Sequence, residues 1–133
     1  MKDLLPRFQE LEREISREKG PFWLFALFLR ENAVNRLWDV VVSAPWTEGH
    51  WGDTLEFMAS RLQETLRPED MVRVSRIVVI ERGNPGLDEI TQEFNVEHGA
   101  VEVRDETFFG LEIKRGYILA SNPPSVEAAV PVG

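Results

Sequence analysis

Two apolar runs near the start of the chain constrain the fold most. Residues 22–29 form an unbroken apolar run, and residues 37–44 form a second one that only Asp39 and Ser43 interrupt. The segment between them, residues 30–36, is too polar to continue a core helix. Because short apolar runs bounded by polar turns are typical of buried strands, the sequence predicts two central strands joined by a short turn.

Three other segments have the spacing of helices. Residues 4–15 carry apolar side chains every three or four positions in a charged background, which predicts an amphipathic helix. Residues 53–66 repeat this pattern, with Asp53 as the predicted N-cap. An asparagine–proline pair at 84–85 predicts the start of a short helix that runs to about residue 94.

The remaining strands are predicted in the second half of the chain. Residues 74–80 are rich in β-branched side chains, and residues 100–104 alternate between apolar and charged positions. Residues 108–120 are predicted to form one long strand bent near Gly116, with a hairpin turning there as the alternative. Residues 121–133 contain three prolines and no regular period, which predicts a disordered tail.

The predicted order is therefore helix, strand, strand, helix, strand, short helix, strand, strand. Because short turns join consecutive strands, we expect a single α+β domain over residues 1–120, with a mostly antiparallel sheet of about five strands and helices packed on a face. An α/β mixed sheet is the alternative. The order resembles that of small profilin-like or roadblock-like domains, a resemblance of element order that implies no function.

Composition narrows the classes of partner. The net charge is −8, with fifteen basic and twenty-three acidic residues, so we expect neither a nucleic-acid partner nor an anionic membrane surface. The absence of cysteine excludes disulfides and thiolate chemistry. The first twenty residues are charged rather than arranged as a signal segment, and no apolar run reaches the length of a membrane span. We expect a soluble cytoplasmic protein.

The loop at residues 45–52 is the first candidate site. It gathers Trp46, His50 and Trp51 between a predicted strand and a predicted helix. Loops on a rigid scaffold often carry binding groups, and exposed tryptophans are enriched at interfaces. This reading predicts a contact surface for another protein or for a second copy in a homodimer. In the alternative reading, both indole rings fold back over the edge of the core.

Two sets of residues could hold a divalent metal. Glu48, His50 and Asp53 lie close together in the sequence, and Glu97 and His98 could join them from elsewhere. Their spacing follows no recognised metal motif, so solvated or capping roles are the alternative.

The second set is Asp39 with Glu112 and Lys114, which resembles the pattern of PD-(D/E)xK nucleases. In that family, two carboxylates hold a metal and the lysine positions or activates the attacking water. The resemblance implies a metal-assisted hydrolase. Two predicted helices intervene between the acidic residue and the Glu-x-Lys here, whereas the family usually has them on successive strands. Simple strand alternation also explains Glu112 and Lys114 as solvated positions.

No phosphate-binding loop, dinucleotide fingerprint or nucleophile elbow occurs, so we expect no cofactor. The sequence favours a non-enzymatic role, as a protein-interaction or small-ligand-binding module that acts as a homo-oligomer. A divalent-metal-assisted hydrolase is the alternative.

Overall fold

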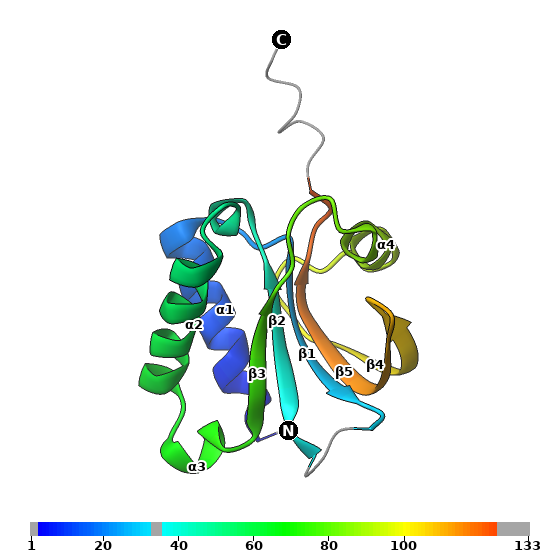
Figure 1. Ribbon diagram of the computed structural model, residues 1–133. Coiled ribbons are helices and arrows are strands. Elements are labelled where there is room, and N and C mark those ends of the chain that lie inside the picture. Colours follow the sequence, from blue (N-terminus) through cyan, green and yellow to red (C-terminus); the bar gives the residue numbers. More distant parts are fainter. Residues whose placement is uncertain (1–2, 33–35, 125–133) are drawn as a thin grey trace.

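The sheet of this protein has five strands in the order β3-β2-β1-β5-β4. A computed structural model describes residues 3–32 and 36–124 (Figure 1). Neighbouring strands are antiparallel, except that β2 and β3 are parallel. The predicted α+β class, with a mostly antiparallel five-stranded sheet, is confirmed. The strands are β1 (Leu24–Arg30), β2 (Trp38–Ser43), β3 (Val74–Val79), β4 (Val101–Phe108) and β5 (Leu111–Ser121).

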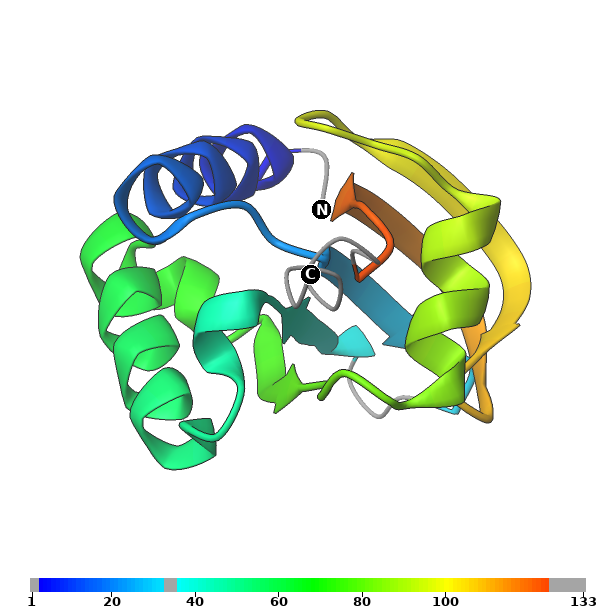
Figure 2. The same ribbon diagram turned by 90° about the horizontal axis from the view of Figure 1, so that it is seen from above.

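Helices cover both faces of the sheet (Figure 2). α1 (Leu5–Lys19) and α2 (Trp51–Thr65) pack on one face, and α4 (Pro85–Glu93) packs on the other. A single 3-10 turn, η2 (Pro45–Thr47), leads from β2 to α2, and the short α3 (Pro68–Met71) precedes β3. Among the described residues, no helix combines the length and the apolar character needed to cross a membrane.

The central strand β1 explains the first apolar run. Every residue from 22 to 29 is buried. Phe25 and Leu27 contribute to the core under α1 and α2, whereas Ala26 and Phe28 contribute to the core under α4. A strand covered on both faces needs apolar side chains at successive positions rather than at alternate ones, so the prediction of two central strands is confirmed.

The prediction of one strand over residues 108–120 is right for residues 111–120, which lie in β5, and wrong at its start, because Phe108 ends β4. The chain turns at Phe109 and Gly110, which have φ angles of 55° and 75°, and Phe108 pairs with Leu111 across the turn. The predicted irregularity near Gly116 is present, because the register of β5 against β1 shifts between the pairs Leu29–Arg115 and Arg30–Ile113. A Cβ atom at Gly116 would lie 2.8 Å from Cδ1 of Phe28. The glycine is needed because the Phe28 ring crosses directly over the β5 backbone.

The two predicted helix starts differ in outcome. The Asn84 side chain accepts a hydrogen bond of 2.8 Å from the amide of Gly86, which confirms it as the cap of α4. Asp53 is not the cap of α2, because the helix already begins at Trp51 with His50 as the N-cap residue. The Asp53 carboxylate instead lies in the first helical turn, where the helix dipole favours a negative charge.

The last strand extends one residue beyond the predicted domain end. Ser121 ends β5, and the amide of Asn122 donates a hydrogen bond of 2.9 Å to the carbonyl of Trp23. Residues 125–133 of the predicted tail lie outside the described residues, as do residues 33–35 of the predicted turn between β1 and β2.

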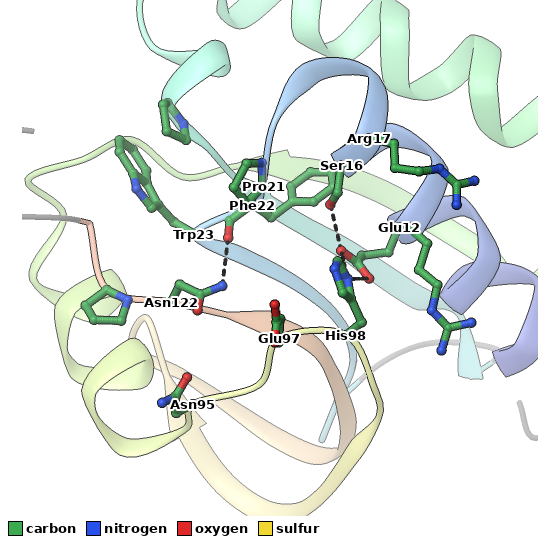
Figure 3. Close-up of a pocket in the computed structure, with 13 residues that line it drawn as sticks. Glu12, Ser16, Arg17, Pro21, Phe22, Trp23, Asn95, Glu97, His98 and Asn122 are labelled. Carbon is green, nitrogen blue, oxygen red and sulfur yellow. Dashed lines mark hydrogen bonds and ion pairs between the residues drawn. The ribbon is translucent and has the colours of Figure 1, made fainter.

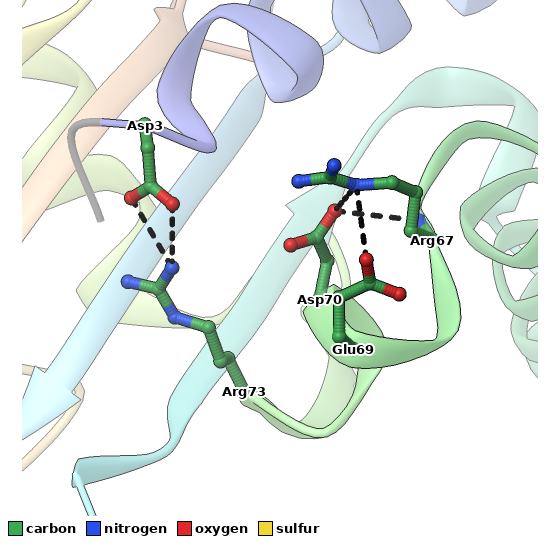
Figure 4. A network of polar contacts seen from close by, with 5 residues as sticks. All are labelled: Asp3, Arg67, Glu69, Asp70 and Arg73. Carbon is green, nitrogen blue, oxygen red and sulfur yellow. Dashed lines mark hydrogen bonds and ion pairs between the residues drawn. The ribbon is translucent and has the colours of Figure 1, made fainter.

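Arginine–carboxylate pairs surround the short helix α3 (Figure 4). Nε of Arg67 donates to Oδ2 of Asp70 at 3.1 Å, and the Arg67 amide reaches the same oxygen at 3.3 Å. These hydrogen bonds, first of all the one from the Arg67 side chain, hold the pKa of Asp70 below its ordinary value of 3.8. The ionised form of Asp70 is therefore the one that the fold stabilises.

This pair predicts a stability loss at low pH. Because the folded-state pKa of Asp70 is lowered, its contribution is present above the ordinary pKa and is lost as the pH falls through the lowered value. We expect the free energy of unfolding to fall more steeply below about pH 4 in the wild type than in Asp70→Asn. Urea unfolding at a series of pH values measures both slopes. Glu69→Gln, a matched control on the same helix, should keep the steep slope. Equal slopes in the wild type and Asp70→Asn would contradict this role of Asp70.

Candidate functional site

The three residues predicted in the loop at 45–52 have different environments. Trp46 is half-buried in η2, and its indole N–H donates to the carbonyl of Gly20 at 3.2 Å. Its ring packs edge-on against Phe22 and Phe57, with centroid distances of 5.4 and 5.7 Å. Trp46 thus covers the edge of the core. Trp51, by contrast, is 57% exposed at the start of α2, and His50 beside it is also exposed.

The predicted metal ligands of this loop are not gathered around one point. Glu48 turns towards the segment after β3, where its Oε2 accepts a hydrogen bond of 2.9 Å from the Arg82 amide. His50 and Asp53 line a small cavity of about 340 Å³ beside Trp46. Within residues 3–32 and 36–124, no three side chains of histidine, aspartate or glutamate are placed to hold a metal ion.

The nuclease-like set is also separated. Asp39 is only 2% exposed and lies on the α4 side of β2, where it forms ion pairs with Arg30 at 3.0 Å and Arg76 at 3.3 Å. Glu112 and Lys114 flank Ile113, whose side chain belongs to the core on that same side. Glu112 therefore points to the opposite face of β5, whereas Lys114 lies at a shift in the register between β1 and β5. The strand β1 also lies between β2 and β5.

A groove lies where β1 begins and β5 ends, between α1 and the segment that follows α4 (Figure 3). Its volume is about 690 Å³. The apolar part of its lining comes from Pro21, Phe22 and Trp23, together with Pro45 and Pro123. Its polar part comes from α1 and from Asn95, Glu97, His98 and Asn122. We call it the Glu12–His98 groove.

A buried carboxylate and an imidazole meet in this groove. Glu12 is only 1% exposed, and Nδ1 of His98 lies 2.9 and 3.0 Å from its two carboxylate oxygens. The hydroxyl of Ser16 donates to Oε2 of Glu12 at 2.7 Å. Because an ionised carboxylate only accepts hydrogen bonds, Nδ1 of His98 carries the hydrogen in this arrangement. The other ring nitrogen, Nε2, has no partner among the described residues.

This arrangement differs from a hydrolytic triad. In such a triad, the serine hydroxyl donates to the histidine, which in turn donates to the acid. Here Ser16 and His98 both donate to Glu12, so the hydroxyl is not activated by the imidazole. What the arrangement provides is an imidazole ring fixed in orientation by a buried carboxylate, at the wall of an apolar groove.

Sequence reasoning found this site only in part. The sequence offers Glu97 and His98 as additional metal ligands, but it gives Glu12 no role beyond the charged background of the first helix. The helical spacing of Glu12 indicates its burial, because Glu12 follows Phe8 by four residues and precedes Ile15 by three. The three residues share one buried face of α1.

No protein-family model, curated protein or solved structure matches the chain. A function must therefore be inferred from the geometry of the residues themselves. Two surfaces stand out in that geometry: the Glu12–His98 groove and the exposed ring of Trp51.

Proposed function

We propose that this protein is a small-ligand-binding module and that its ligand occupies the Glu12–His98 groove. The observation that carries the proposal is an apolar groove of about 690 Å³ with the buried Glu12–His98 pair in its wall. Small-molecule sites in proteins are mostly apolar concavities of about 300–1,000 Å³ with a few convergent polar groups. The groove has both properties.

The buried pair supports a binding role for a physical reason. A carboxylate taken out of water costs free energy unless hydrogen bonds compensate it. Both donors to Glu12 come from the groove region, and one of them, His98, retains a free ring nitrogen. An imidazole that is already oriented loses little further conformational entropy when a ligand binds. We propose that His98 makes a direct polar contact with the ligand. The absence of cysteine suits a reducing compartment, and we propose the cytoplasm.

The proposal predicts that filling the groove abolishes ligand binding. The full chain is screened against a small-metabolite library by thermal denaturation, since a ligand that binds only the folded state raises the melting temperature. Asn95→Trp introduces a large side chain at the groove wall, and Gln92→Trp places the same side chain on the exposed face of α4 as the matched control. We expect the hits to be lost in Asn95→Trp and retained in Gln92→Trp. Hits that survive both substitutions would contradict the groove as the site.

A second candidate function is a protein contact, most simply a homodimer, through Trp51. Trp51 favours this candidate because its large ring is 57% exposed in the single chain. Tryptophans that become buried when a partner binds are frequent hot spots of interfaces. Light scattering on the wild type and on Trp51→Ala tests it. A wild-type dimer that becomes a folded monomer would support the contact, and a monomer in both samples would refute the homodimer.

The metal-assisted hydrolase has less support than either candidate. Asp39 is engaged by two arginines, and β1 separates its strand from the strand that carries Glu112 and Lys114. Glu48 is held by the backbone amide of Arg82. Neither set therefore offers a cluster of free ligands in the described part of the chain.

A further inference from the structure

We propose, resting on the proposed function, that the groove ligand is a small zwitterion with an apolar body, of the amino-acid or short-peptide type. In this proposal, Arg13 and Arg17 face the carboxylate of the ligand and Glu97 faces its ammonium group. The apolar body lies over Phe22 and Trp23. The inference follows from the charges that line the groove and from where each is fixed.

The α1 wall of the groove is cationic. Arg13 and Arg17 are four residues apart, so they lie on the same face of the helix, and both line the groove. Both are exposed, and neither has an ion-pair partner among the described residues. Three of the acids of α1 are engaged elsewhere: Glu14 and Glu18 pair with Arg61 of α2, and Glu12 is held by His98 and Ser16. The fourth, Glu10, lines the hollow beside Arg61 rather than this groove.

The facing wall carries the opposite charge. Glu97 lines the groove from the segment after α4 and, like the two arginines, has no ion-pair partner in the part of the chain that the structure describes (Figure 3). Both neighbours of Glu97 in the sequence are held by hydrogen bonds. Val96 exchanges two backbone hydrogen bonds with Ser121, of 2.7 and 3.0 Å, and His98 is bonded to Glu12. Glu97 is therefore presented on ordered backbone rather than on a free loop.

Charge complementarity selects the class of ligand. A ligand with only a negative charge would leave Glu97 without a partner and would be repelled by it. A ligand with only a positive charge would face two unpaired arginines. A zwitterion pairs all three groups. The apolar rings between the two walls exclude water and suit an aliphatic or aromatic body.

The experiment uses probes that differ only at their charged ends. Leucine and the dipeptide Leu-Leu are titrated into the full chain by NMR, each in its free form, with an acetylated amino end and with an amidated carboxyl end. We expect each blocked form to bind about tenfold more weakly than the free form, or worse, because a charge-assisted contact is lost. Tighter binding of the dipeptide assigns the groove to peptides, and tighter binding of leucine assigns it to free amino acids.

Charge variants then locate each end of the ligand. In Glu97→Gln, we expect the acetylated and free probes to bind alike, while amidation still weakens binding. In Arg13→Gln/Arg17→Gln, we expect the amidated and free probes to bind alike, while acetylation still weakens binding. Glu93→Gln, which removes an exposed carboxylate of α4 outside the groove, should preserve both preferences.

Three results would overturn the inference. The first is that blocked and free probes bind equally well. The second is that the charge variants weaken the binding of all probes equally. The third is that no zwitterionic probe binds while library compounds still shift the NMR signals of the groove. In the last case, the proposed function survives and only the ligand class is wrong. If no compound of any class shifts the groove signals, the proposed function fails with it.

Discussion

Replacing Phe25 with alanine is expected to lower the free energy of unfolding by about 3–5 kcal/mol, the largest effect of any substitution considered for this protein. Phe25 is fully buried near the start of β1, the middle strand of the sheet. Its ring packs edge-on against Phe22 with centroids 5.0 Å apart. Alanine would remove the buried ring and leave a cavity between β1 and the layer formed by α1 and α2.

Urea unfolding of the variant measures this loss, and Val72→Ala provides the control. Val72 is 70% exposed, so its truncation should change the free energy of unfolding by less than about 0.5 kcal/mol. Because domains are stable by about 5–15 kcal/mol in total, Phe25→Ala should lose a large fraction of the stability of the fold. Equal effects of the two substitutions would contradict the placement of β1 at the centre of the core.

Trp46→Ala is expected to cost about 2–3 kcal/mol, somewhat less than a fully buried tryptophan would. The substitution removes the ring contacts with Phe22 and Phe57 and the hydrogen bond to the carbonyl of Gly20. Trp51→Ala deletes the same side chain five residues later. Since Trp51 is largely exposed, we expect a change within about 0.5 kcal/mol.

This pair of variants separates the two interpretations of the loop. Melting curves and urea unfolding of both proteins, recorded under identical conditions, show which indole stabilises the fold. A loss confined to Trp46→Ala means that only Trp51 is available as a contact residue, and that binding lost in a Trp46 variant must be checked for unfolding. Similar losses in both variants would mean that the Trp51 ring is covered.

The sequence predicted the centre of the fold well because the centre depends on local patterns. The apolar runs before and after residues 30–36 became β1 and β2, and Asn84 caps α4 as its position before a proline indicates. These features are determined by neighbouring residues and by burial on both faces.

Features that depend on distant contacts could not be predicted. The hairpin turn at Phe109 and Gly110 was missed because phenylalanine rarely adopts a positive φ. The Phe109 ring packs closely on Gly86 of α4. A Cβ atom at Gly86 would lie 2.5 Å from Cδ1 of Phe109. Glu12 was missed for a similar reason, since its partner His98 is 86 residues away in the sequence. Only the folded chain brings the two sides of the groove together.

The claim that the Glu12–His98 groove binds a small molecule is tested most directly by mapping a bound ligand on the full chain. Amide and indole NMR signals are recorded with and without the strongest hit of the metabolite screen. We predict that the signals of Trp23, Glu97 and His98 shift on binding, while those of Trp51 and the exposed face of α4 do not. Shifts centred on Trp51, with the groove signals unchanged, would contradict the account.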